Sequence, residues 1–189
     1  MAIQQKVTIR DFEEFLALSE NNDRLYELID GEIVEKMPTQ EHGYLATLIS
    51  AKIFNYLETS PIGIVVVETR HQMPDDEHNA YVPDAAFTAN ERSGALVIEG
   101  AVPQMPDLVV EIKSPNNVEL KMRKKALYYL ENGTRLVWLV FPRKKQIEVH
   151  TAETIAILIV DDVLDGGDVL PGFTLPVRTI FARQISEGL

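Results

Sequence analysis

The chain of 189 residues contains no cysteine, which excludes disulfide bonds and metal sites built from thiolates. It also lacks any apolar run of the roughly 20 residues that a membrane helix needs, so we expect no membrane partner. The first residues, MAIQQKVTIRDFEEF, are mixed in charge and contain no apolar signal-peptide core. We therefore expect a cytoplasmic protein. A hydrophobic content of 46% is enough for a single domain over residues 1–189.

Several local motifs of known chemistry are also missing. The sequence has no GxSxG nucleophile elbow, no P-loop, no GxGxxG fingerprint and no HExxH pair. In the absence of such a pair, His71, His78 and His150 are expected at the surface rather than as metal ligands. The large aromatic side chains of the second half are expected in or beside the core: Tyr128, Tyr129 and Trp138.

Basic residues are scarce, and the formal net charge of −11 argues against a protein that coats nucleic acid. The charge is unevenly spread, however. Residues 113–145 hold nine basic and two acidic residues, so this segment carries about +7 and the rest of the chain about −18. It is either a solvated helix face or a local surface that attracts anions.

Hydrophobic spacing predicts the order of the elements. Helices are expected at about 8–18, 42–57 and 117–131, with Thr8 as N-cap of the first. Asp30-Gly31 is typical of a hairpin turn within 24–37. Further strands are expected at 62–73, 80–89, 107–114, 134–141, 146–151 and 155–160, followed by a short β extension. The core order αβββαβ favours an α/β (α+β) domain with a mixed sheet flanked by helices.

The stretch DLVVEIKSP, residues 107–115, places charges near the end of an apolar strand. Alternation puts Asp107, Val109, Glu111 and Lys113 on one face, with Glu111 and Lys113 roughly 6.6 Å apart along the strand. Both side-chain ends can then reach one small ligand. Charges in such a place are costly to bury unless they are paired or hold a metal. A carboxylate beside an ammonium suits a phosphodiester and a hard cation such as Mg²⁺.

A second acid is needed to hold such a cation, and two Pro-Asp pairs compete for that role. Asp107 lies four residues before Glu111 on the same strand, roughly 13 Å away, which is too far. Asp84 follows Pro83 on the preceding strand, and neighbouring strands run only about 5 Å apart. We therefore expect Asp84 to join Glu111, and Asp107 to start or cap its own strand.

These residues resemble the PD-(D/E)XK phosphodiesterase superfamily. The ordered segments YELIDGEIV, VPDAAF, PDLVVEIKSP, KKALYYLENG, LVWLVFP and LPGFTLPV resemble, over about residues 10–185, the Uma-two-type family of restriction-endonuclease-like proteins. The resemblance implies a restriction-endonuclease-like αβββαβ core, with an N-terminal helix plus hairpin and a C-terminal β extension. It implies a metal-dependent phosphodiesterase.

The resemblance also implies roles for particular residues. Asp84 and Glu111 match the metal-binding acids, and Mg²⁺ or Mn²⁺ would be held by these two, the Ile112 carbonyl and waters. Lys113 matches the motif lysine, whereas Lys125 matches the helix lysine that many relatives use instead. Helical spacing independently places Lys125 on a core-facing stripe. Two further residues match an acid and a histidine of the family: Glu27 and His42.

Each of these residues has a purely structural alternative. Glu111 with Lys113 could be a partly buried ion pair, and Asp84 a turn residue. The stem of Lys125 could pack while its ammonium stays in water. Glu27 could be an exposed hairpin acid, and His42 could simply sit in the first turn of its helix.

The expected function is therefore hydrolysis of phosphodiester bonds by a metal-activated water, in a DNA endonuclease. The resemblance also leads us to expect a homodimer. The alternatives are a catalytically inactive module that binds nucleic acid or serves a structural role, and hydrolysis of a small phosphodiester or nucleotide.

Overall fold

The computed structural model describes residues 6–183. The helices are α1 (Ile9–Leu16), α2 (Gln40–Thr59), α3 (Glu119–Glu131) and α4 (Val177–Ile180), with short 3-10 turns at Ser19–Asn21 and Pro142–Lys144. The strands of the first half are β1 (Leu25–Ile29), β2 (Glu32–Lys36), β3 (Gly63–Val67), β4 (Ala85–Ala89) and β5 (Leu108–Ile112). Those of the second half are β6 (Leu136–Phe141), β7 (Gln146–His150), β8 (Ile155–Leu158), β9 (Val163–Asp165) and β10 (Thr174–Pro176).

The N-terminal helix and hairpin form as their local signals predict. Thr8 caps α1 through its side chain, and the Asp11 carboxylate accepts a hydrogen bond from the Thr8 N–H, which completes a capping box. Asp30 (φ 52°) and Gly31 (φ 81°) supply the left-handed backbone of a tight hairpin turn. The turn fixes the register of β1 against β2, in which Leu25 lies opposite Lys36 and Glu27 opposite Val34.

The central sheet has the strand order β3-β4-β5-β6-β7-β8. β5 and β6 pair in parallel, with α3 as the crossover between them, and every other neighbouring pair in this sheet is antiparallel. The expected αβββαβ order is therefore realised by α2, β3, β4, β5, α3 and β6. The predicted C-terminal extension is the separate β9–β10 pair.

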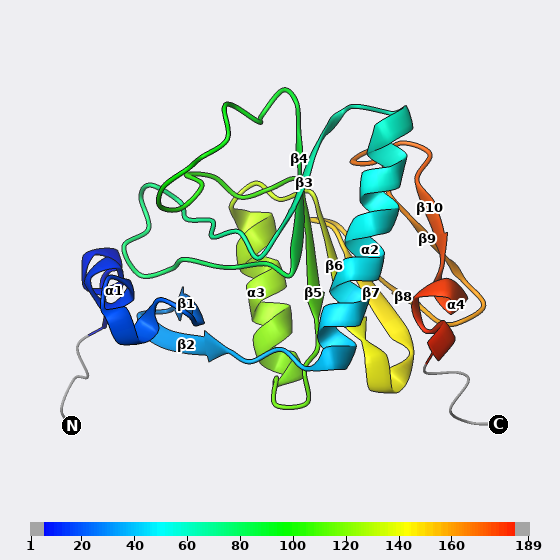
Figure 1. The fold of residues 1–189 in the computed structure, drawn as a ribbon. Coiled ribbons are helices and arrows are strands. Elements are labelled where there is room, and N and C mark those ends of the chain that lie inside the picture. Colours follow the sequence, from blue (N-terminus) through cyan, green and yellow to red (C-terminus); the bar gives the residue numbers. More distant parts are fainter. Residues whose placement is uncertain (1–5, 184–189) are drawn as a thin grey trace.

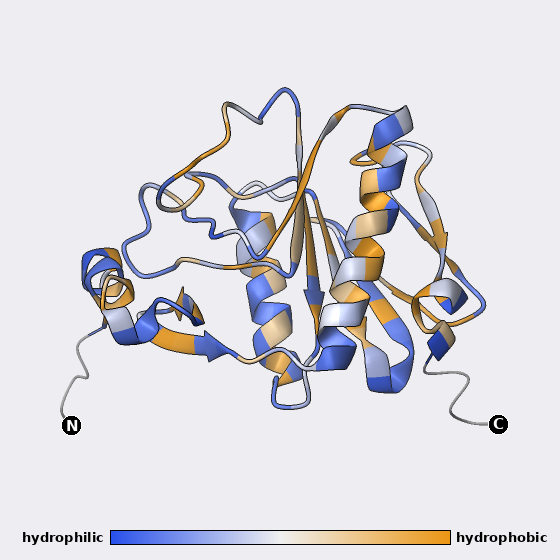
Figure 2. Cartoon of the chain, viewed as in Figure 1, coloured by the Kyte–Doolittle hydropathy of each residue, from blue (hydrophilic) through white to orange (hydrophobic). Residues whose placement is uncertain are grey.

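The helices α2 and α3 lie on opposite faces of this sheet (Figure 1). Leu108, Val110 and Ile112 of β5 pack on the α2 side, together with the C-terminal strands and α4. Val109 packs on the α3 side, beside Met122 and Tyr129 of that helix. The strands of the sheet are largely apolar, and α2 alternates apolar and polar residues along its length (Figure 2). No helix within residues 6–183 is long and apolar enough to cross a membrane.

Four local predictions are corrected. The strand expected at 62–73 ends at Val67, because Glu68 has a left-handed backbone (φ 48°) that interrupts the ladder. The strand expected at 80–89 is confined to Ala85–Ala89, because Pro83 has no N–H for a ladder and residues 80–81 form isolated bridges instead. α3 begins at Glu119 rather than at Asn117, whose side chain accepts the Ser114 N–H. The prediction that His71 and His150 lie at the surface is wrong, since each residue is only 1% exposed. They can be buried because the His71 ring bonds the Gln104 carbonyl and the His150 ring bonds the Glu148 carboxylate.

Candidate active site

Strand pairing brings the two predicted metal ligands together. Asp84 immediately precedes β4, and Ala85 lies opposite Val110, so Asp84 comes beside Glu111 at the carboxyl end of β5. The Ile112 N–H donates a hydrogen bond to Asp84 Oδ2 over 2.7 Å, which ties the two strand ends together. Both carboxyl groups are buried, Asp84 at 2% and Glu111 at 5% exposure. The sequence-based choice of Asp84 over Asp107 thus agrees with the geometry.

Lys125 of α3 lies between two buried acids. Its Nζ is 2.7 Å from Glu111 Oε1, and it donates to both Glu27 carboxylate oxygens over 2.8 and 3.1 Å. Burial lowers the pKa of the Lys125 ammonium, but Glu111 and Glu27 outweigh it and raise that pKa above its usual value. Lys125 is therefore a fixed cation.

Glu27 reaches the site from the hairpin. One of its oxygens also accepts the Val82 N–H over 2.8 Å, so Glu27 joins β1, the segment before β4 and α3. The side chain is 4% exposed, in agreement with a site carboxylate and not with an exposed hairpin acid.

Two cationic or polar side chains hold Asp84. Lys36 of β2 donates to Asp84 Oδ1 over 2.6 Å, and the His42 ring Nε2 lies 2.9 Å from Oδ2. Thr39 caps α2 and fixes its first turn, which presents His42 to the carboxylate. Burial raises the pKa of the Asp84 carboxyl, but Lys36 and His42 outweigh it and hold that pKa well below its usual range.

Glu111 has the opposite electrostatic balance. Burial raises the pKa of its carboxyl above the usual value, and Asp84 and Glu27 add to this rise against the opposing lysines. The Tyr129 hydroxyl donates to Glu111 Oε1 over 2.7 Å, and burial followed by the adjacent Glu111 charge raises the pKa of that phenol. Tyr129 therefore acts as a neutral donor that orients Glu111.

Sequence reasoning missed Lys36 and the phenol of Tyr129 as site residues. Lys36 could have been found, because a two-residue turn at Asp30-Gly31 sets Lys36 opposite Leu25 and thus on the same face as Glu27. Tyr129 was expected only as a core aromatic. Its spacing from Lys125, one helical turn further along α3, is the signal that it shares the face.

The structure does not bring the Lys113 side chain to Asp84 and Glu111, the two predicted metal ligands. β5 ends at Ile112, and the Lys113 ammonium donates to the adjacent Ser114 carbonyl over 3.3 Å. Lys113 lines a separate cavity, whereas Asp84, Glu111, Ile112 and Lys125 line one of about 180 Å³. Glu111 and Lys113 thus line different cavities, although the backbone stays in the ladder with β6 up to the Lys113 N–H and turns only at Ser114–Asn117. The expectation that both side chains reach one ligand stays a prediction.

The formal charges around this cavity do not balance. Glu35 also lines the cavity, but it is paired at 3.5 Å with Arg24, which lies outside the cavity lining. Among the remaining charged groups, Glu27, Asp84 and Glu111 contribute three negative charges, and Lys36 and Lys125 contribute two positive ones. The set therefore retains a formal charge of −1. In a buried cluster, such an excess favours the binding of a further cation.

Comparison with known structures assigns the architecture to a class of nuclease fold. The chain is similar to a crystal structure described as "a putative nuclease belonging to DUF820" from Anabaena variabilis ATCC 29413, with a TM-score of 0.76 and 23% sequence identity, covering 90% of this chain and 96% of that chain. At this identity the likeness shows the fold. A family model, Uma2, described as "Putative restriction endonuclease", matches residues 12–178, and the chain belongs to this family. The comparison with curated proteins found no match.

Proposed function

We propose that this protein is a divalent-metal-dependent endonuclease that hydrolyses phosphodiester bonds in DNA. The family to which it belongs is described as "Putative restriction endonuclease", and the solved structure that shares its fold is described as "a putative nuclease", which supports the same class. The observation that carries the proposal is the cavity lined by Asp84, Glu111 and Lys125. It joins a pair of acids suited to a metal with a fixed cation suited to a phosphate.

The donor set fits Mg²⁺ or Mn²⁺. Two carboxylates, with the Ile112 carbonyl and waters, are the hard oxygen ligands that such ions prefer, and Mg²⁺ is often held by only one or two carboxylates plus substrate phosphate. Within residues 6–183, no group of three or more His, Cys, Asp or Glu residues is arranged to hold a metal ion, so the proposed site relies on the two carboxylates together with substrate and water oxygens. Adding a divalent cation and one phosphodiester charge to the −1 cluster gives a sum of zero.

When bound, the divalent ion would activate the attacking water and offset the charge that develops on the phosphoryl oxygens. The chain's own residues would fix the geometry. Asp84 is oriented by Lys36, His42 and the Ile112 N–H, and Glu111 by Tyr129 and Lys125. With its pKa raised, Lys125 would stabilise the phosphoryl charge as a cation rather than remove a proton.

A catalytically inactive module is the rival, and the net charge of −11 is the observation that favours it. Hydrolysis of a small phosphodiester is the other alternative. The discriminating experiment incubates the full chain with supercoiled plasmid, and separately with a chromogenic small diester, with Mg²⁺, Mn²⁺ or EDTA.

We expect metal-dependent nicking of the plasmid, abolished by EDTA and by Glu111→Gln. Cleavage of the small diester alone would replace the proposal with the second alternative, and cleavage of neither would support the inactive module. We also propose that the protein acts as a homodimer, in which each chain cuts one strand of a duplex. Light scattering should then give twice the mass of the 21.3 kDa chain.

A further inference from the structure

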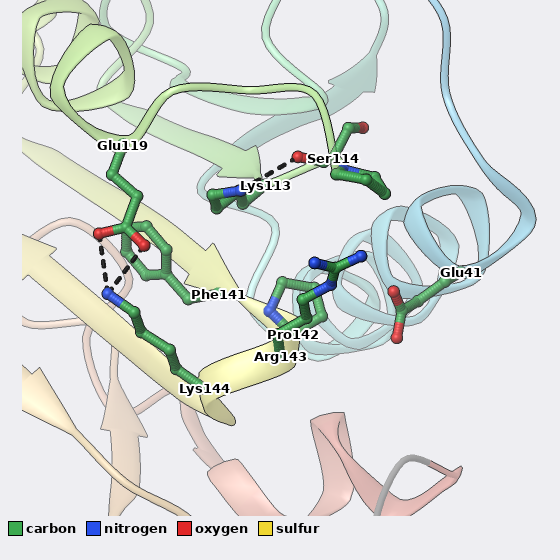
Figure 3. Close-up of a pocket in the computed structure, with 9 residues that line it drawn as sticks. Glu41, Lys113, Ser114, Glu119, Phe141, Pro142, Arg143 and Lys144 are labelled. Atoms are coloured by element: carbon green, nitrogen blue, oxygen red, sulfur yellow. Dashed lines mark hydrogen bonds and ion pairs between the residues drawn. The ribbon is translucent and has the colours of Figure 1, made fainter.

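A second cavity lies next to the candidate active site and contains cations that the proposed reaction does not use. It has a volume of about 230 Å³, and Lys113, Arg143 and Lys144 line it together with Glu41, Glu119 and Phe141. The two cavities share Ser114 as a lining residue, so they meet at the turn that follows β5. Figure 3 shows the residues that line the second cavity.

The sheet topology explains why these cations gather there. β5 and β6 are parallel, so their carboxyl ends leave the sheet at the same edge. The Lys113 N–H still donates to the Val140 carbonyl over 2.9 Å, which fixes its backbone beside the end of β6. Arg143 follows in the 3-10 turn Pro142–Lys144. In open α/β sheets, ligands typically bind outside the carboxyl ends of the strands.

The charges in the second cavity are unequally engaged. Lys144 is paired with Glu119 at 2.8 Å, and Glu119 is also bonded by Arg123. For Lys113 and Arg143, in contrast, no carboxylate lies within ion-pair distance in the part of the chain that the structure describes. Among the side chains drawn in Figure 3, the Lys113 ammonium bonds the Ser114 carbonyl, and no bond to the Arg143 guanidinium is marked.

We propose that Lys113 and Arg143 form a binding site for a backbone phosphate of the nucleic acid strand, next to the phosphate that is cleaved. This inference rests on the proposed nuclease function. A guanidinium offers a planar fork of donors that matches phosphate oxygens, and an ammonium adds a point charge on a flexible stem. Such contacts position a strand without reading its sequence.

The spacing agrees with a strand that crosses both cavities. Glu111 and Lys113 are two residues apart, roughly 6.6 Å along an extended chain. A nucleic acid strand advances about 3.4 Å per nucleotide. Lys113 would therefore meet a phosphate within about two nucleotides of the one at Glu111. This assigns the motif lysine to substrate binding, while Lys125 supplies the cation at the reacting phosphate.

The test measures binding of labelled single-stranded and duplex oligonucleotides to the full chain by fluorescence anisotropy, in EDTA and over a range of salt concentrations. The variant Lys113→Met/Arg143→Gln removes both proposed phosphate ligands. Lys121→Met/Lys124→Met removes the same charge from exposed positions of α3 outside both cavities. Since Arg143 is exposed and Lys113 half-buried, the melting temperature of the first variant should stay close to that of the wild type.

We expect the cavity variant to bind on the order of tenfold more weakly and to lower the slope of log K against log salt by about 0.7 to 0.9 for each cation removed. The matched variant should change affinity much less. Equal losses in both variants, or none in the first, would overturn the proposal while leaving the nuclease function intact. If the wild type neither binds oligonucleotides nor nicks plasmid, the nuclease function itself fails. Should the double variant unfold, Arg143→Gln alone provides the same comparison.

Discussion

The two ends of β5 each carry a buried acid beside a cation, yet they are built differently. At the amino end, Asp107 accepts from Arg92 over 2.8 Å and from the Ala89 N–H over 2.9 Å. Arg92 also donates to the Met105 and Gly133 carbonyls. At the carboxyl end, Glu111 shares Lys125 with Glu27 and lies beside Asp84.

The difference lies in charge balance and access, because burial is nearly equal. Asp107 is 1% exposed and Glu111 5%. One carboxylate and one guanidinium cancel at the amino end, and their remaining bonds go to backbone groups that close a loop. At the carboxyl end, three carboxylates face two ammonium groups around a cavity. A buried ion pair alone is therefore weak support for function, whereas an unbalanced set that lines a cavity is stronger.

The largest effect is expected on cleavage activity, when Asp84 and Asp107 are replaced in turn. Asp84→Asn removes a proposed metal ligand while keeping the shape, so we expect plasmid nicking to fall on the order of 100-fold or more. Asp107→Asn should retain cleavage when assayed below its melting temperature. Activity kept in Asp84→Asn but lost in Asp107→Asn would move the active site to the other end of β5.

The second expectation concerns the free energy of unfolding when Lys125 or Arg92 is replaced. Lys125→Met leaves Glu27 and Glu111 buried without their shared partner, which should lower the free energy of unfolding by about 3–5 kcal/mol. Arg92 is more exposed, its side chain at 32%, so Arg92→Met should cost less, about 1–3 kcal/mol. Urea denaturation measures both.

A double variant provides the control for this second comparison. Glu27→Gln/Lys125→Met should recover part of the stability lost in Lys125→Met, because one unpaired carboxylate has been removed. A larger loss of unfolding free energy in Arg92→Met than in Lys125→Met would contradict this expectation. It would mean that the ion pair at the amino end of β5 contributes more to stability than the cluster at the carboxyl end.

The third expectation concerns metal binding. Mn²⁺ at ten times its dissociation constant should stabilise the wild type by about 1.4 kcal/mol, or about 3–6 °C in melting temperature. Asp107→Asn should show the same rise, whereas Glu111→Gln should lose most of it. Thermal melting with and without Mn²⁺ measures this rise in melting temperature. An equal rise in the wild type and in Glu111→Gln would show that Mn²⁺ binds elsewhere.

The smallest expected effect is a pH dependence at the amino end of β5. His71 bonds the Gln104 carbonyl, and the Gln104 amide donates to the carbonyl of Arg92, the partner of Asp107. Burial lowers the pKa of the His71 ring below its ordinary 6.5, and the hydrogen bond to the Gln104 carbonyl, which raises that pKa, only partly offsets this effect. The unfolded chain therefore binds the extra proton first, and stability is lost as pH falls from about 6.5 towards the folded pKa.

The slope that His71 contributes is at most about 1.4 kcal/mol per pH unit. Replacing it by glutamine should make the loss of unfolding free energy between about pH 7 and pH 5 shallower. An unchanged slope in His71→Gln would mean that another group sets this dependence.

Local periodicity was enough to predict much of the fold. The capping box at Thr8, the turn at Asp30-Gly31 and the apolar stripe of α2 depend on residues within a few positions of one another. The order αβββαβ followed from these elements. Alternation along β5, and the close spacing of neighbouring strands, also selected Asp84 over Asp107.

The partners of each charge were decided only by the tertiary structure. Alternation along β5 placed Lys113 beside Glu111, but in the structure the two side chains line neighbouring cavities. Lys36 and Lys125, 48 and 98 residues away from their acid partners, hold Asp84 and Glu27 instead. A sequence fixes which groups need a partner, since buried charge is costly everywhere in the fold. Which distant cation supplies that partner depends on how the hairpin, β4 and α3 pack together.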